Sequence, residues 1–241
     1  MGMNCKEEQI RTAMLLGEDG LDRLSRAHVA VFGVGGVGGQ VCEALARAGI
    51  GAIDLYDNDT VSKSNLNRQL VALHSTVGQY KVDVMKERIL DINPDCTVRV
   101  FKVFYLPENA DQFPLDGYDY IADAIDTVSA KIELAVRARA CGTPLIAAMG
   151  TGNKLDPTRF CVTDLAKTAG CPLARVMRRE LKARGITHQK VVYSTEPAAP
   201  SALPAPKETS GKRPPASVSF VPPVAGLIMA GEIVKELCKG K

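Results

Sequence analysis

The chain has 241 residues, of which 46% are apolar, 24% charged and 5% aromatic. These shares are ordinary for a packed globular protein and exclude the fibrous and intrinsically disordered classes. With 30 Lys and Arg against 27 Asp and Glu, the net charge of +3 is too small to indicate a nucleic-acid partner unless the cations cluster locally.

Strand-like and helical patterns alternate up to about residue 150. Residues 7–27 predict one or two amphipathic helices, with Leu15, Leu16, Leu21 and Leu24 on the apolar face. Strands are predicted at 28–32, 52–56, 97–104, 118–124 and 144–148, and helices at 37–48, 81–90 and 131–139. Strands that alternate with helices require crossover connections, so we expect an α/β fold: a Rossmann-like, mostly parallel sheet with helices on both faces.

The regularity decreases after Gly152. A strand at 160–163, a basic helix at 172–184 and an apolar helix at 224–237 are expected, with a proline-rich segment at 196–215. We expect one domain over residues 1–241, made of a nucleotide-binding core at about 7–165 and an irregular C-terminal extension at about 166–241. Within the extension, a mobile loop at 196–216 is expected either to close over a substrate or to act as a passive linker.

Neither end of the sequence predicts membrane insertion. No apolar segment follows a basic N-terminus as it would in a signal peptide. The apolar run at 218–230 contains two prolines and is shorter than the ~20 residues that a spanning helix needs. We therefore expect a cytoplasmic protein without membrane contact. Seven cysteines with no CxxC pair indicate reduced thiols and argue against a structural zinc site.

A glycine-rich segment lies between the first predicted strand and the following helix, and it contains Gly33, Gly35, Gly36 and Gly38. Glycines let the backbone approach phosphates closely, and a helix N-terminus offers N–H groups to an anion. Asp57, at the end of the second strand, is placed to accept hydrogen bonds from ribose hydroxyls. On the glycine motif alone, NAD would be favoured.

Cations and a carboxylate further along the chain favour ATP over NAD. A departing pyrophosphate needs cations to neutralise its charge, and Mg²⁺ needs a carboxylate. Arg68 and Lys81 supply the cations, and Asp126, at the end of the fourth strand, is the predicted Mg²⁺ ligand. Ligands of open α/β sheets bind at the carboxyl ends of the strands, where these residues are expected.

Five motifs together resemble those of the ubiquitin-activating (E1-like) adenylating superfamily, over roughly residues 7–165. They are Gly33-x-Gly35-Gly36-x-Gly38, Asp57-x-Asp59-x-Val61, Asn65-x-x-Arg68-Gln69, Gly78-x-x-Lys81 and Asp123-Ala-Ile-Asp126. Within it, segments 44–51, 91–94, 123–126, 156–158 and 162–168 are most similar to the tRNA threonylcarbamoyladenosine dehydratase branch. The sulfur-carrier activators commonly carry two CxxC zinc pairs, which this chain lacks.

The resemblance implies a role for each matching residue. The glycine loop, Asp57 and Asp59 would hold the nucleotide, with Asp57 on the ribose. Asn65, Arg68 and Lys81 would surround the triphosphate, and Asp126 would bind Mg²⁺. An N-terminal arginine, here Arg11, would reach the γ-phosphate bound by the neighbouring subunit, which implies a homodimer.

The resemblance also implies a reaction of the ligase type. ATP would activate the threonyl carboxylate of the modified adenosine at position 37 of ANN-decoding tRNAs. The carbamoyl oxygen of the same nucleoside would then attack the acyl-adenylate and close an oxazolone ring, with net loss of water. Because the substrate supplies the nucleophile, no catalytic cysteine is required, and positioning and charge stabilisation carry the catalysis.

Other functions are compatible with the same residues. They are adenylation of the C-terminal Gly-Gly of a ubiquitin-like sulfur carrier, a non-catalytic nucleotide-binding scaffold in a sulfur relay, and an NAD-dependent dehydrogenase. A cysteine desulfurase or sulfur acceptor is a further candidate partner. Cys171 is either a nucleophile or, as we favour, an incidental thiol. Asp123 is either a second acidic partner of Asp126 or, as we favour, a strand-end residue.

A basic cluster between residues 167 and 190 is the candidate tRNA surface, with a solvated helix face as the alternative. Its members, which face Glu180 as the only acidic residue there, are Lys167, Arg175, Arg178, Arg179, Lys182, Arg184 and Lys190. Lys207, Lys212 and Arg213 add positive charge to the proline-rich loop.

Overall fold

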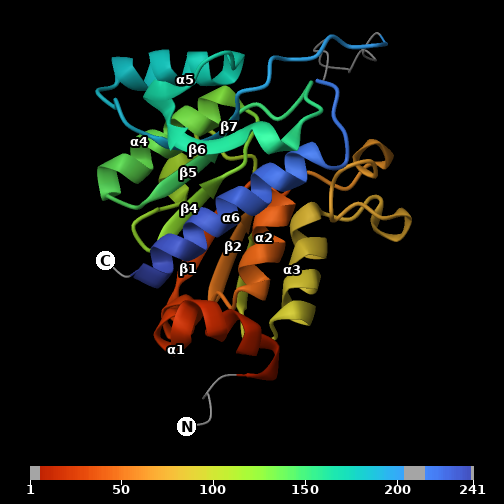
Figure 1. Ribbon diagram of the computed structural model, residues 1–241, viewed down its shortest axis with the longest axis vertical. Coiled ribbons are helices and arrows are strands. Elements are labelled where there is room, and N and C mark those ends of the chain that lie inside the picture. Colours follow the sequence, from red (N-terminus) through yellow and green to blue (C-terminus); the bar gives the residue numbers. More distant parts are fainter. Residues whose placement is uncertain (1–5, 204–214, 240–241) are drawn as a thin grey trace.

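A computed structural model describes residues 6–203 and 215–239. Its core is a seven-stranded sheet in the order β3-β2-β1-β4-β5-β7-β6 (Figure 1). Neighbouring strands are parallel, except that β6 runs antiparallel to β7. The strands are β1 (His28–Phe32), β2 (Ala52–Tyr56), β3 (Thr97–Phe101), β4 (Tyr120–Asp123), β5 (Leu145–Ala148), β6 (Phe160–Asp164) and β7 (Lys190–Ser194). The predicted α/β fold with a mostly parallel sheet is confirmed.

Helices cover both faces of the sheet, as predicted. They are α1 (Ile10–Arg26), α2 (Gly38–Arg47), α3 (Lys81–Ile92), α4 (Val128–Cys141), α5 (Pro172–Ala183) and α6 (Val221–Lys239). One apolar cluster joins the sheet to α1, α2, α3 and α6, and a second joins its other face to α4 and α5. Figure 1 shows α6 crossing in front of the sheet beside α2.

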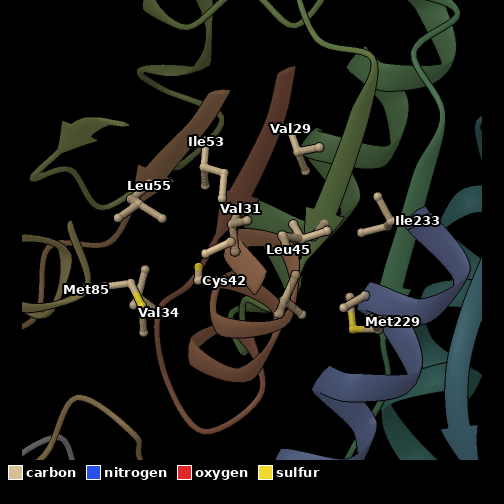
Figure 2. Packing of buried hydrophobic residues seen from close by; sticks show 14 of the residues in the cluster. Val29, Val31, Val34, Cys42, Leu45, Ile53, Leu55, Met85, Met229 and Ile233 are labelled. Carbon is tan, nitrogen blue, oxygen red and sulfur yellow. The ribbon is translucent and has the colours of Figure 1, made fainter. Parts of the chain in front are cut away.

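The larger cluster is closed by α6. Figure 2 shows Val29 of β1, Leu45 of α2 and Met229 of α6 around the same apolar space, and all three side chains are fully buried. The backbones of α2 and α6 approach closely, since a Cβ at Gly226 would lie 2.3 Å from the carbonyl oxygen of Val37. A glycine is therefore required at this contact between helices.

The C-terminal extension is more regular than the sequence predicts. Strand β7 is unforeseen, and it lies inside the sheet between β5 and β6. Its apolar run of Val191, Val192 and Tyr193 is too short to be distinguished from a loop by periodicity. Helix α6 begins at Val221, earlier than expected, because prolines are tolerated in a first helical turn, where no partner for the N–H is needed.

The N-terminal helix corrects one expectation. Gly17 has φ 75° and ψ 166°, which breaks the helical path. Leu16, before this kink, and Leu21 and Leu24, after it, pack against the larger apolar cluster. Leu24 is fully buried, whereas Leu15 is 88% exposed, so the assignment of Leu15 to the apolar face is wrong.

Two further expectations concern a membrane-spanning helix and the loop at 196–216. In the described part of the chain, no helix has both the length and the apolar character needed to cross a bilayer. Part of the loop predicted to be mobile, residues 204–214 with Lys207, Lys212 and Arg213, lies outside the described residues.

Candidate nucleotide site

A cavity with a volume of about 430 Å³ lies at the C-terminal ends of β1, β2 and β4. The glycine loop, the end of β2, the segment 65–69, the start of α3 and the turn after β4 form its walls. The predicted site residues that line it are Gly33, Gly35, Gly36, Asp57, Asp59, Asn65, Arg68, Lys81 and Asp126. Folding thus brings the separate motifs to one place, at the sheet edge where ligands of α/β proteins bind.

The glycines of the loop differ in how much space a side chain would have at each position. Gly33 has φ 88°, and a Cβ there would lie 2.7 Å from the carbonyl oxygen of Ala124. Gly38 is buried outside the cavity lining, and its Cβ would lie 1.7 Å from the oxygen of Gly33. A Cβ on Gly35, in contrast, would approach only Gln69 Nε2, at 3.8 Å. Gly33 and Gly38 therefore allow the turn to fold, whereas Gly35 leaves room for a ligand.

Asp57 fixes the glycine loop to the end of β2. Its Oδ2 accepts a hydrogen bond from Val34 N at 2.7 Å, and its Oδ1 accepts one from Asp59 N at 2.8 Å. Burial raises the pKa of Asp57, and the charge of Lys81 and these two N–H groups oppose the rise. Each carboxylate oxygen keeps a second lone pair, which suits the predicted contact with ribose hydroxyls.

Lys81 is held at the cavity wall by a short antiparallel bridge. Val61 N donates to Gln79 O at 2.8 Å, and Gly78 N donates to Val61 O at 2.9 Å. Gly78 has φ 91°, which explains the glycine three residues before the lysine. The Lys81 side chain is 6% exposed, and its Nζ lies 2.6 Å from Asp59 Oδ2.

Arg68 is fixed by its own segment. Its Nη1 donates to Ser64 O at 3.1 Å and to Asn67 Oδ1 at 2.8 Å. Asn65 uses its side-chain oxygen to accept from Ser62 N at 3.0 Å, which stabilises the turn. Gln69 also lines the cavity, 9% exposed, and its Oε1 has no partner among the described residues. Gln69 belongs to the Asn65-x-x-Arg68-Gln69 motif, but the resemblance implies no role for its side chain in the site.

Asp126 fits the chemistry of a Mg²⁺ ligand. It lies exposed at the cavity, with Thr127 Oγ1 at 3.4 Å from Oδ1, and it forms no ion pair with any described residue. Mg²⁺ is commonly bound in proteins by one or two carboxylates together with substrate phosphate oxygens. A single free carboxylate beside a phosphate-sized cavity matches that donor set.

Asp123 supports the turn that carries Asp126. It is fully buried, and its Oδ2 lies 2.9 Å from Lys131 Nζ of α4. Its Oδ1 accepts from Ile125 N at 3.2 Å. Burial raises the pKa of Asp123, and Lys131 opposes the rise. Because Asp123 does not line the cavity, its role is that of the favoured strand-end residue.

Two other predicted residues lie outside the cavity. Arg11 is exposed on α1, at the end of the sheet where β1 begins, whereas the glycine loop follows the end of β1 (Figure 1). Cys171 is 7% exposed, and its Sγ accepts a weak hydrogen bond from Ala174 N at the start of α5. This position favours a structural thiol over a nucleophile.

Some members of the basic cluster form ion pairs and others do not. Lys190 belongs to β7 and pairs with Glu236, an acidic residue outside segment 167–190. Arg179 and Arg184 flank Glu180 at 2.7 and 3.0 Å. A second concavity of about 480 Å³ lies against α5 and is lined by both apolar and basic side chains. Its lining includes Leu165, Ile186, Arg175, Arg178, Arg179 and Lys182.

Comparison with known proteins identifies the family. The model of the ThiF family matches residues 7–241. The chain belongs to the ThiF family. The tRNA threonylcarbamoyladenosine dehydratase of Bacillus subtilis (strain 168) is 47% identical to this ThiF-family chain over 238 residues, which cover 95% of the chain and 94% of the relative.

Solved structures agree with this assignment. The E. coli tRNA N6-threonylcarbamoyladenosine dehydratase in complex with ATP superposes with a TM-score of 0.86 at 38% identity, over 95% of this chain and 93% of that one. The AMP complex of the same enzyme gives 0.85 at 39%, with the same coverage. The predicted resemblance to the E1-like superfamily and to its dehydratase branch is confirmed.

Proposed function

We propose that this ThiF-family chain is an ATP-dependent dehydratase of threonylcarbamoyladenosine in tRNA, at position 37 of ANN-decoding species, acting in the cytoplasm. The observation that carries the proposal is the cavity in which the glycine loop, Asp57, Arg68, Lys81 and Asp126 meet. The likeness to relatives that bear this name, one of them solved with ATP and with AMP, supports it.

In this proposal the cavity binds ATP and neutralises its phosphates. Asp57 accepts hydrogen bonds from the ribose, and the backbone at Gly35 and Gly36 lies along the phosphates. Lys81, held beside Asp59 before ATP binds, turns its ammonium towards the phosphate charge that develops as pyrophosphate leaves. Mg²⁺, held by Asp126, would supply further charge neutralisation.

The chemistry has two steps. A threonyl carboxylate oxygen forms a bond to the α-phosphorus of ATP, and the bond from that phosphorus to pyrophosphate breaks. The carbamoyl oxygen of the same nucleoside then bonds to the activated acyl carbon, and AMP leaves with the former carboxylate oxygen. The ring closes with loss of one proton, and its intramolecular geometry removes the entropic cost of bringing two reactants together.

The surface around α5 is the proposed contact for the tRNA backbone. Lys167, Arg175 and Lys182 are exposed and form no ion pair with other described residues, so their charge is available to phosphates. Binding should then weaken as salt rises. Replacing Arg175 and Lys182 by Gln is expected to reduce the slope of log affinity against log salt by about 1.4 to 1.8. Arg26→Gln, at the opposite end of the sheet, is the matched control.

The proposal includes a homodimer in which Arg11 enters the cavity of the neighbouring subunit. Arg11 is exposed and does not line its own cavity, and the nearby Met14 and Leu15 are 73% and 88% exposed, as interface residues of an isolated subunit would be. A cysteine desulfurase or sulfur acceptor as a further partner stays a prediction.

The direct test uses tRNA that carries threonylcarbamoyladenosine, with ATP and Mg²⁺. We expect AMP, pyrophosphate and a nucleoside lighter by one water, and we expect Arg68→Ala to lower the turnover rate by about a hundredfold or more. AMP formation that requires a Gly-Gly carrier protein would favour the sulfur-carrier alternative instead. ATP binding with no AMP formation under either condition would favour the nucleotide-binding scaffold. Reduction of a nicotinamide cofactor without ATP would favour the dehydrogenase.

A further inference from the structure

Asn153 forms hydrogen bonds with two separate segments of the C-terminal extension, at Ala199 and at Ala216. Asn153 has φ 56°, and among the described residues it is the only one other than glycine with a positive φ. Its carbonyl oxygen accepts from Ala199 N at 2.7 Å, and its own N donates to Ala216 O at 2.7 Å. Its side-chain Oδ1 accepts from Ala216 N at 2.8 Å. The left-handed conformation, which Asn tolerates better than most residues, directs these groups to both segments.

The segment held by Asn153 forms part of the cavity wall. We call residues 215–217 the strap. Pro215 and Ser217 both line the nucleotide cavity, together with Thr151 and Gly152. A Cβ at Gly152 would lie 2.6 Å from Pro215 Cβ, so the strap lies directly against the backbone next to Asn153.

The other side of the strap is attached to the segment that carries Arg68. Asn67 Nδ2 donates to Ser217 O at 3.0 Å, and Asn67 Oδ1 accepts from the Arg68 guanidinium at 2.8 Å. The amide of Asn67 therefore contacts the strap with one end and Arg68 with the other. Through it, the position of the strap is coupled to the position of a cation at the cavity.

The strap also leaves a polar group unsatisfied. Ser217 Oγ is buried and has no hydrogen-bond partner among the described residues. A buried hydroxyl without a partner is unfavourable, because it has lost its hydrogen bonds to water. A ligand or ordered water that enters the cavity beside Ser217 would recover part of this cost, so occupancy of the cavity and the order of the strap should favour each other.

We propose that Asn153 and Asn67 are positioning residues that hold the strap against the nucleotide cavity and thereby fix Arg68 for the bound triphosphate. The inference rests on the proposed function in one respect, since it takes the ligand to be ATP. It assigns to the C-terminal extension a direct part in nucleotide binding, although its residues stand far from the nucleotide motifs in the sequence.

The first test is the equilibrium affinity of the full chain for ATP with Mg²⁺, measured by calorimetry without tRNA. Asn153→Gly keeps the left-handed backbone and the two main-chain hydrogen bonds, but it loses the bond from Ala216 N to Oδ1. Asn67→Ala loses both amide contacts. We expect Asn153→Gly, which loses one hydrogen bond, to weaken ATP binding about threefold, and Asn67→Ala, which loses two, to weaken it about tenfold. Asn153→Asp, which keeps the acceptor oxygen, should retain most of the affinity.

A double variant separates positioning from general destabilisation. Because both residues act through the same strap, Asn153→Gly combined with Asn67→Ala should weaken ATP binding less than the product of the single effects. The matched control is Asn93→Ala, which removes one side-chain hydrogen bond, to Ile50 O, outside the cavity. It should lower Tm and leave ATP affinity unchanged.

A second readout does not depend on activity. Hydrogen exchange at the amides of Ala216 and Ser217 should slow when ATP binds, and it should be faster in Asn153→Gly than in the unaltered chain. The inference is overturned if the unaltered chain binds ATP while both single variants bind it equally well and Ala216 exchange is unchanged. An unaltered chain that binds no ATP contradicts the proposed function instead.

Discussion

Single glycines in the nucleotide loop have separate physical roles, and substitution distinguishes them. In Gly35→Ala the added methyl meets only Gln69 Nε2, at an ordinary contact distance of 3.8 Å, so the free energy of unfolding should change by no more than about 0.5 kcal/mol. The methyl should nevertheless occupy ligand space, and we expect ATP affinity to fall at least tenfold, measured by calorimetry. Gly38→Ala is the contrasting variant, because its Cβ would overlap the oxygen of Gly33. It should unfold at a much lower temperature.

The buried carboxylate of Asp54, in β2, predicts how the free energy of unfolding depends on pH. Asp54 accepts from Arg99 Nε at 2.8 Å and from Tyr118 Oη at 2.7 Å, and His28 Nε2 lies 3.2 Å away. Burial alone would raise the pKa of Asp54, but the hydrogen bonds from Arg99, Tyr118 and His28 hold it below its ordinary value of 3.8. The folded state therefore favours the ionised form.

The lowered pKa of Asp54 determines how the stability of the fold changes with pH. The stabilisation is present in full above pH 3.8 and is lost as the pH falls through the lower pKa of the folded state. Asp54→Asn should lower the free energy of unfolding at neutral pH by about 1.5–3 kcal/mol, measured by urea denaturation, because the neutral amide loses the charge-assisted hydrogen bonds from Arg99 and Tyr118. Its stability should also decline less steeply below pH 3.8 than that of the unaltered chain. An equally steep decline would contradict the assignment.

Which site residues the sequence can reveal depends on how they are assembled. Gly33, Asp57, Arg68, Lys81 and Asp126 are recognisable because each stands in a short motif at a predicted strand or helix end. The contacts of Asn153 with Ala199 and Ala216 join separate loop segments, and no local sequence pattern predicts them. The pairing of Asp123 with Lys131 is likewise visible only once α4 packs on the sheet.

Among the elements, the contact between α2 and α6 offers a matched pair of substitutions. Gly226 and Gly231 both lie on α6, but only Gly226 faces the carbonyl of Val37, whereas a Cβ at Gly231 would meet nothing within 4 Å. Gly226→Ala should lower the free energy of unfolding by about 1–3 kcal/mol through overpacking. Gly231→Ala should raise it by up to about 1 kcal/mol, because alanine favours the helix. Thermal and urea unfolding measure both changes.

The elements that could be predicted from the sequence are those with a strong pattern and a clear end. Strands β1 and β2 occupy their predicted residues, since each is a β-rich run with a clear end, at Gly33 after β1 and at Asp57 after β2. Helix α2 ends close to Gly49, which has φ 85°, as a C-terminal glycine should. Strand β7 escaped prediction because its place in the sheet depends on β5 and β6, not on its own five residues.

At the scale of the whole molecule, the proposed homodimer predicts complementation between two inactive variants. Arg11→Ala keeps an intact cavity but cannot serve the partner, and Asp126→Ala keeps Arg11 but loses the Mg²⁺ carboxylate. Equal mixing after exchange of subunits should restore about a quarter of the unaltered activity, because half of the dimers are mixed and each has one complete site. No recovery in subunits shown to have exchanged would mean that Arg11 does not act across the dimer.

The sheet order has a consequence for how the chain folds during synthesis. Strand β6 leaves the ribosome before β7, which is its only neighbour in the sheet. The apolar face of α2, including Leu45, stays uncovered until α6 has been made. A nascent chain that stalls before Lys190 therefore exposes both an unpaired strand and an open apolar face, which chaperones and proteases recognise. One that stalls between β7 and Val221 still exposes the apolar face. Packing of α6 on α2 therefore completes the burial of the apolar cluster on this face of the sheet.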